Sequence, residues 1–178
     1  MNTLLVLGAT PFQTPIVSKA RRMGHHVITM DNVPGNPAHR QADESALVSI
    51  ADPEAVLAYA RKRGIDGIVT GGSEIGLEAL GLVCDELGLA GINRDQALQL
   101  THKDRFRAFQ RNHGLPHPEF FVFRDWDEFA ETARGLTGEF ILKPVDRSGS
   151  KGVSVLHMTA PGDPAGYRRQ VTHALSQS

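Results

Sequence analysis

Short apolar runs separated by amphipathic stretches constrain what the first half of this chain can fold into. The runs are "TLLVLG" at 3–8, "HVITMD" at 26–31, "ALVSI" at 46–50 and "DGIVT" at 66–70. Mainly apolar runs of this length are typical of strands buried on both faces of a parallel sheet. Parallel strands need crossover connections, which helical patterns between the runs can supply. We therefore predict an α/β fold, with a Rossmann-like parallel-sheet domain at 1–92.

Capping residues indicate where the helices of this domain begin and end. Asp52 before Pro53 predicts a helix start, because the carboxylate accepts hydrogen bonds from free N–H groups and proline suits the first turn. Ser73 is predicted to cap the next helix, and Gly88 is predicted to close it.

A different order of elements follows residue 92. Two short helices, predicted to be capped by Asn93 and Thr101, form a helical linker at 93–114. After the linker come a strand "EFFVFR", a helix "DWDEFAETARG", and two strands, "EFILK" and "GVSVLH", around one loop. Because two strands that flank one loop suggest an antiparallel pair, we predict a small α+β subdomain at 115–178.

The composition argues against several classes of protein. A formal net charge of −1 gives no electrostatic basis for binding nucleic acid or an anionic membrane. No apolar stretch approaches the roughly 18 residues of a membrane span, and the N-terminal run lacks the basic leader of a signal peptide. The single cysteine, Cys84, excludes an intramolecular disulfide, and the eight histidines show no zinc-site spacing. We therefore expect a cytoplasmic protein.

The first loop, "LGATPFQ", is a weak match to a dinucleotide-binding fingerprint. Gly8 fits, but Thr10 and Gln13 stand where the second and third glycines belong, so a pyrophosphate could not approach the backbone closely. Asp31 lies where such a fold holds a ribose. A tight turn and a site for a small anion such as a carboxylate both remain open. The candidate substrate-contact residues are Gly8, Ala9, Thr10, Gln13 and Glu74.

The second loop, "KPVDRSGSKG" at 143–152, joins the last two predicted strands. It is not a Walker loop, because the glycine, lysine and serine stand in another order and a strand follows instead of a helix. Gly149 and Gly152 could still turn backbone N–H groups toward phosphates, with Ser148 and Ser150 adding hydroxyl donors. Lys143 ends its strand on the same face as Ile141, and a solvated lysine is the alternative there.

Lys103 is a cation at an unfavourable position. "THKD" reads as a capping box at Thr101, which places Lys103 in the first helical turn. A positive charge at the positive end of a helix costs about 0.3–1 kcal/mol. Residues that break a local rule in this way often mark a functional site, although Lys103 could instead pair with a nearby carboxylate.

Taken in order, these motifs resemble the ATP-grasp superfamily, and within it the carbamoyl-phosphate-synthase-like carboxylate–amine ligases. The resemblance rests on "LTHKDRFRAFQRNHGLPHPEFFVF" followed by "FILKPVDRSGSKGVSVL". In members of that family a helix-borne lysine, a "KP" strand end and a "GSxGV" loop recur in this order along the chain. "LVLGATPFQTPIVSKARRMGHHVITMDNVPGNPAHRQAD" is similar to the family's preceding Rossmann-like domain. The resemblance implies a pre-ATP-grasp domain followed by the small α+β lobe of an ATP-grasp domain.

The resemblance also implies roles for individual residues. Lys103 would contact the α-phosphate side of ATP, and Lys143 would bridge the α- and β-phosphates. The lid over the triphosphate would consist of Ser148, Gly149, Ser150, Lys151, Gly152 and Val153. No residue is assigned as catalytic.

The implied activity is activation of a carboxylate as an acyl phosphate, which an amine or similar nucleophile then attacks. The implied cofactors are ATP and Mg²⁺, and the metal ligands, like the adenine-binding hinge, are expected outside this chain. We therefore expect an N-terminal fragment that is inactive alone. Its expected partners are small-molecule carboxylate and amine substrates, and a homodimer is compatible with the family. A non-catalytic nucleotide-binding or regulatory module is the alternative, and a dinucleotide-dependent oxidoreductase is a weaker one.

Overall fold

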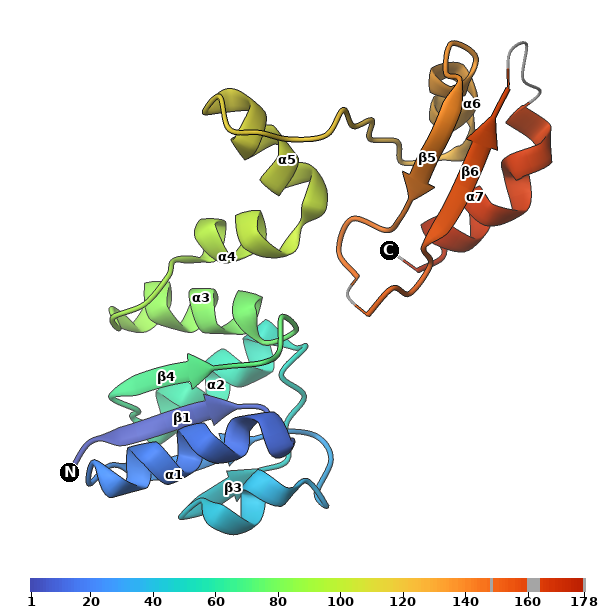
Figure 1. The fold of residues 1–178 in the computed structure, drawn as a ribbon. Coiled ribbons are helices and arrows are strands. Elements are labelled where there is room, and N and C mark those ends of the chain that lie inside the picture. Colours follow the sequence, from blue (N-terminus) through green and yellow to red (C-terminus); the bar gives the residue numbers. More distant parts are fainter. Residues whose placement is uncertain (148, 160–163, 178) are drawn as a thin grey trace. The chain divides into compact units, whose positions relative to one another are not determined.

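The computed structural model describes residues 1–147, 149–159 and 164–177 (Figure 1). The chain forms two compact units, Met1–Thr101 and His102–Ser178. None of the described helices has the length and apolar character needed to cross a membrane.

The first unit is built on a parallel sheet with the strand order β3-β2-β1-β4. Its strands are β1 (Thr3–Leu7), β2 (His26–Met30), β3 (Glu44–Ala46) and β4 (Gly67–Thr70). All three pairings are parallel, with Leu5 opposite both Ile28 and Ile68. The predicted α/β class and parallel sheet are therefore confirmed. The third strand predicted near 46–50 exists, but its bounds are wrong, since β3 begins at Glu44 and its pairing with β2 ends at Ala46 opposite Met30.

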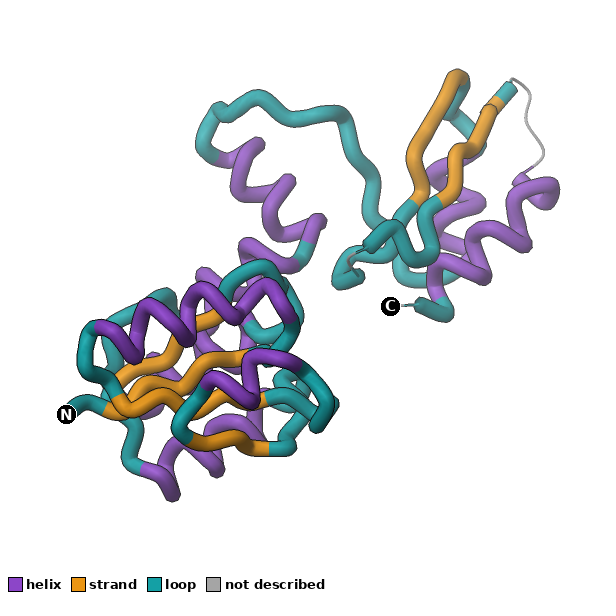
Figure 2. Tube along the Cα trace, turned by 60° about the horizontal axis from the view of Figure 1, so that its bottom comes forward, coloured by secondary structure: helices purple, strands orange, loops and turns teal. Residues whose placement is uncertain are grey.

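Helices cover both faces of this sheet (Figure 2). They are α1 (Thr14–Arg22), α2 (Pro53–Arg63) and α3 (Leu77–Leu87), with short 3-10 helices η1 (Pro11–Gln13) and η2 (Pro37–Gln41). On one face, Val6 and Val27 pack with Val17 of α1. On the other, Leu5 and Ile28 pack against α2 and α3. Alternate residues of β1 therefore enter opposite layers of core, which explains why its sequence is apolar throughout.

Two of the predicted helix ends are confirmed and one is wrong. The Asp52 carboxylate accepts a hydrogen bond from the Ala55 N–H at 3.0 Å, and Gly88 ends α3 in the left-handed conformation. Ser73 does not cap α3, which begins only at Leu77. A turn in which the Leu77 N–H donates to the Glu74 carbonyl at 3.1 Å delays the start of the helix.

The helix α4 (Arg94–Thr101) belongs to the first unit. The sequence placed the end of this domain at 92, whereas the compact units divide after Thr101. The predicted cap at Asn93 is confirmed, because Asn93 and Gln96 each accept a hydrogen bond from the other's backbone N–H. Gly81 of α3 permits the close approach of α4, since a Cβ there would lie 2.8 Å from the Asn93 carbonyl oxygen and 2.9 Å from the Ala97 Cβ.

The second unit contains a two-stranded antiparallel sheet with several helices. Its elements are α5 (Lys103–Asn112), α6 (Trp126–Ala133), β5 (Gly138–Leu142), β6 (Ser154–Met158), the 3-10 helix η3 (Pro164–Tyr167) and α7 (Arg168–Leu175). Leu142 and Leu156 pack with Phe129 of α6 and Val171 of α7. The predicted antiparallel pair is confirmed. The strand predicted at "EFFVFR" is wrong, because residues 119–123 join no ladder.

We predict that Gly81→Ala loosens α4 from α3. The new methyl group would meet backbone atoms that cannot rotate away, so the free energy of unfolding of the first unit should fall by about 1–3 kcal/mol. Amide hydrogen exchange of α3 and α4 measures the effect. Gly35→Ala is the matched control, since a Cβ at Gly35 meets nothing within 4 Å. Equal protection of the two variants would contradict this account of the contact.

Candidate functional site

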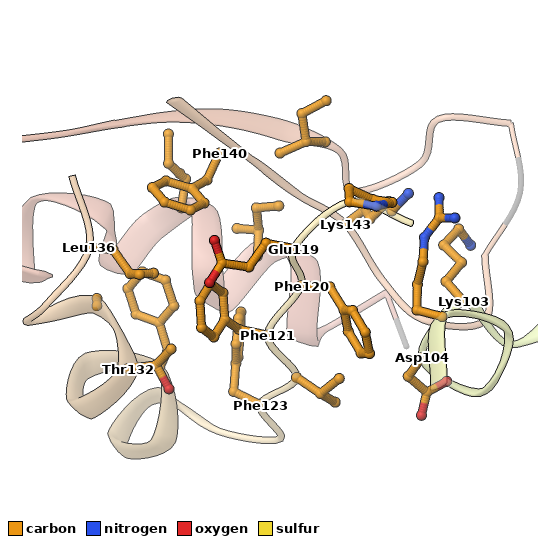
Figure 3. A pocket seen from close by; sticks show the side chains of 18 of the residues that line it. Lys103, Asp104, Glu119, Phe120, Phe121, Phe123, Thr132, Leu136, Phe140 and Lys143 are labelled. Atoms are coloured by element: carbon orange, nitrogen blue, oxygen red, sulfur yellow. The ribbon is translucent and has the colours of Figure 1, made fainter. Parts of the chain in front are cut away.

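A cavity of about 540 Å³ lies within the second unit (Figure 3). It is bounded by α5, the extended segment 118–123, β5 and α6. Most of its lining residues are apolar, and one part of the lining is an aromatic wall formed by the rings of Phe120, Phe121, Phe123, Phe129 and Phe140. Lys103 and Lys143 lie at one end of the view, and Phe140, Leu136 and Thr132 lie at the other. The cavity therefore has one cationic end and one apolar end.

Lys103 is the first residue of α5 and is bonded to the loop that follows β5. Its backbone N–H donates to the Val145 carbonyl at 2.9 Å. Its ammonium donates to the carbonyls of Val145, at 3.4 Å, and of Arg147. The predicted place in the first helical turn is confirmed, but the predicted cap at Thr101 is wrong. Thr101 is instead the last residue of α4, where its hydroxyl donates to the Ala97 carbonyl at 2.9 Å.

Lys143 immediately follows β5 and extends from the exposed face of the sheet. Ile141 and Lys143 are exposed, whereas Leu142 between them is buried, as the strand alternation predicted. Partial burial, with the nearby charges of Arg107 and Lys103, lowers the pKa of the Lys143 ammonium from its ordinary value. Three cations thus converge here, and the structure brings Lys103 and Lys143 together from positions 40 residues apart.

The loop after Lys143 has several residues in the left-handed region of backbone conformation. Gly149, Ser150 and Gly152 have φ of 69°, 58° and 70°. Ser150 is unusual in this respect, since residues other than glycine rarely adopt such backbone angles. The Val153 N–H donates to the Ser150 carbonyl at 3.4 Å, and Lys151 and Val153 are exposed. Ser148, the first residue of the predicted lid, lies outside the described residues.

Gly152 fixes the end of the loop against its beginning. It is buried, and a Cβ at this position would lie 2.8 Å from Cγ of Pro144 and 3.1 Å from Cγ of Gln177. The Arg147 guanidinium also donates to the Gln177 carbonyl. The loop therefore returns onto its own first residues and onto the end of the described chain.

The second group of predicted residues follows β1 in the first unit, and a glutamine braces it. Gln13 is buried, and its Oε1 accepts from the Thr10 N–H at 3.0 Å and the Thr10 hydroxyl at 2.6 Å. Its Nε2 donates to the Gly71 carbonyl, which joins this loop to the one after β4. Gly8 has a φ of 90°, and a Cβ there would lie 3.0 Å from the Gln13 Cδ. Gly8 and Gln13 therefore build the turn.

Asp31 supports the same turn from the neighbouring strand. Its carboxylate accepts from the Ala9 N–H at 3.0 Å and from the Val33 N–H at 2.9 Å, and the side chain is 7% exposed. A carboxylate engaged in this way is not presented to a ribose, which argues against the oxidoreductase alternative. Glu74 is exposed in the turn before α3, three residues after Gly71.

The sequence analysis missed Arg107, which lines the cationic end of the cavity. Its spacing of four residues from Lys103 places both on one face of α5 and could have identified it. The aromatic wall was also missed, because the chain segment that carries Phe120, Phe121 and Phe123 was assigned to a strand.

We predict that Gly152→Ala destabilises the second unit more than Gly149→Ala does. Both residues need the left-handed region, which costs about 1–2 kcal/mol for alanine. Only Gly152 also contacts Pro144, so its variant should lose about 1–3 kcal/mol more. Urea unfolding followed by Trp126 fluorescence measures both, since Trp126 is the one tryptophan and lies in this unit. Equal losses would show that Pro144 moves aside freely.

No family model matches the chain, but curated proteins and solved structures do. It is 28% identical over 166 residues to the formate-dependent phosphoribosylglycinamide formyltransferase of Synechococcus sp. (strain CC9311). It is 29% identical over 179 residues to that of Prochlorococcus marinus (strain MIT 9303). These matches cover 92% and 99% of this chain, but only 42% and 44% of the relatives. The chain thus spans less than half the length of the curated relatives it matches.

Solved structures share the fold at lower identity. Phosphoribosylglycinamide synthetase from Anaerococcus prevotii aligns over 99% of this chain and 42% of its own, with a TM-score of 0.69 and 21% identity. N5-carboxyaminoimidazole synthetase from Staphylococcus aureus, complexed with ADP, aligns over 97% of this chain and 45% of its own, with a TM-score of 0.73 and 17% identity. The biotin carboxylase domain of Hydrogenobacter thermophilus 2-oxoglutarate carboxylase, a dimer with MgADP, aligns over 98% of this chain and 41% of its own. Its TM-score is 0.76 and its identity is 16%. The resemblance to ATP-grasp ligases, and the fold it implied, are confirmed.

Proposed function

We propose that this chain supplies the phosphate-binding lobe and part of the substrate site of an ATP-dependent carboxylate–amine ligase. The observation that carries the proposal is the convergence of Lys103, Arg107 and Lys143 at one end of a cavity, beside a loop with left-handed glycines. Cations around an anion site stabilise charge that moves during phosphoryl transfer. The curated relatives, named for formate-dependent formyl transfer, support the reaction class.

In this proposal each part of the second unit has a separate task. Lys103 and Lys143 bind the α- and β-phosphates of ATP as ammonium point charges. The loop from 148 to 153 covers the triphosphate and excludes water, with N–H groups of Gly149 to Val153 as donors. The hydrogen bond from the Lys103 ammonium to the Val145 carbonyl holds Lys103 close to Lys143.

The reaction that we propose proceeds in two transfers. A carboxylate oxygen attacks the γ-phosphorus of ATP as the bond to ADP breaks, which gives an acyl phosphate. The amine then attacks the acyl carbon, inorganic phosphate leaves, and the amine loses a proton. The chain's cations offset negative charge that shifts onto the leaving diphosphate.

Magnesium supplies charge neutralisation between the phosphates in enzymes of this reaction type. Among the described residues, no group of three or more His, Cys, Asp or Glu side chains could hold a metal ion. No set of described residues is therefore assigned to Mg²⁺. We expect these 178 residues to bind ATP without forming ADP.

The first unit is proposed to hold the small-molecule carboxylate and amine substrates at the carboxyl edge of its sheet. Gly8 and Gln13 build the turn there, Ala9 is buried with its N–H bonded to Asp31, and Thr10 and Glu74 are the proposed contacts. Open sheets of this kind bind ligands at that edge. Action in the cytoplasm and assembly as a homodimer also belong to the proposal.

We predict that Lys143→Met and Lys103→Met each weaken ATP binding by about 10-fold or more, since a hydrogen bond to a charged group contributes about 1.5–3 kcal/mol. Isothermal titration with ATP and Mg²⁺ measures the dissociation constant. Lys62→Met, at an exposed position of α2, is the matched control. Absence of ATP binding by the unaltered protein would overturn the proposed function. The alternative of a regulatory module predicts another result. Such a protein would bind ATP, but its full-length form would not convert ATP to ADP when formate and phosphoribosylglycinamide are supplied.

We predict that ATP affinity falls as the pH rises through the pKa of Lys143. That pKa is already lowered by burial and by two neighbouring cations, so the charge is lost at a lower pH than in a free lysine. Phosphate favours the charged form, so binding should also take up a proton at pH values where Lys143 is partly deprotonated in the free protein. Titrations at several pH values measure both effects. Lys143→Arg should remove the pH dependence and keep binding, because guanidinium stays protonated.

A further inference from the structure

Arg107 is a cation that the proposed roles of Lys103 and Lys143 leave without a task. It lies in α5 one turn beyond Lys103, and both side chains line the same cavity. Two like charges spaced by four residues destabilise a helix by about 0.2–0.5 kcal/mol. The helix therefore carries a small cost in order to present two cations on one face.

These cations form no ion pair with a carboxylate among the parts of the chain that the structure describes. No Asp or Glu oxygen there forms an ion pair within 4.0 Å of Lys103, Arg107 or Lys143. Elsewhere in the second unit, Arg124 pairs with Glu128 and Arg147 with Asp146. Asp104, Glu119 and Glu139 also line the cavity, but none of them pairs with the three cations, and Glu139 lies 2.9 Å from His157 instead. The cationic end is therefore suited to an added anion.

The Arg107 guanidinium is oriented from one side only. One of its terminal nitrogens donates to the Gln110 Oε1 at 2.5 Å, and the Gln110 amide donates to the Pro116 carbonyl at 3.0 Å. The guanidinium carbon lies 5.9 Å from the centre of the Phe106 ring. Guanidinium has five N–H donors, and no other hydrogen bond from it occurs among the described residues. The remaining donors form a planar fork that matches two oxygens of a phosphate or carboxylate.

We propose that Arg107 is a third oxyanion-binding residue of this site, which grips phosphate oxygens of the bound nucleotide together with Lys103 and Lys143. This inference rests on the proposed function. Gln110 is the positioning residue that holds the guanidinium toward the cavity. The two lysines act as point charges, whereas Arg107 fixes the orientation of one phosphate through paired hydrogen bonds.

The test compares Arg107→Gln and Arg107→Lys with the unaltered protein by titration with ATP and inorganic triphosphate. Arg107→Gln should weaken the binding of both ligands by about 10- to 100-fold. Arg107→Lys should restore part of the affinity, because it keeps the charge and loses the fork. Arg105→Gln is the matched control, since Arg105 is exposed on the same helix and does not line the cavity.

A second readout separates binding from a merely structural role. Removing the Arg107 charge should raise the pKa of Lys143, which NMR of the lysine side chain can follow. If the unaltered protein binds ATP and Arg107→Gln binds it equally well, the inference fails and the proposed function stands. An equal loss for Arg105→Gln, or unchanged triphosphate binding, would also overturn the inference. If the unaltered protein binds neither ATP nor triphosphate, the proposed function itself fails.

Discussion

The contact between Lys103 and the loop after β5 is the interaction on which the candidate site depends. The backbone N–H of Lys103 and its ammonium both bond to the Val145 carbonyl, and the ammonium also reaches Arg147. Through these bonds the first turn of α5 is attached to a loop that is some 40 residues later in the chain. They hold Lys103 beside Lys143, where Arg107 is the third cation. The carbonyl oxygens stabilise the Lys103 charge but do not neutralise it, so the site keeps its attraction for anions.

The cationic end shows how a site can depart from the rules that stabilise the rest of the fold. A lysine at a helix N-terminus and an arginine four residues later are both unfavourable for α5. The lowered pKa of Lys143 is a further unfavourable effect, since burial and the charges of Arg107 and Lys103 disfavour its charged form. A bound polyphosphate would relieve all three effects at once. Perturbed groups at one end of a cavity are the usual mark of a functional site.

The turn after β1 shows the opposite arrangement, in which polar groups are satisfied within the protein. Gln13 bonds to Thr10 and to Gly71, and Asp31 bonds to the N–H groups of Ala9 and Val33. These bonds join the ends of three neighbouring strands and hold the carboxyl edge of the sheet in a fixed shape. The edge can therefore orient a small substrate, while Gln13 and Asp31 act as its support.

The sequence by itself determined the features that depend on near neighbours in the chain. Buried strands such as 3–7 are recognisable because both faces must be apolar, and the caps at Asp52 and Asn93 because their partners are three residues away. Lys103 was identified because a cation in the first turn of a helix is unfavourable, and Lys143 because strand alternation places it on the same face as Ile141.

The tertiary structure decided the rest. Ser73 and Thr101 have capping side chains, but neighbouring turns and the packing of α4 set where the helices begin. The "EFFVF" segment has the aromatic and β-branched residues of a strand, yet it borders a cavity and pairs with no strand, because pairing needs a sheet edge that local sequence cannot specify. Arg107 gained its meaning only when folding brought Lys143 beside it, since the interaction of charges depends on distance in space and not on separation along the chain.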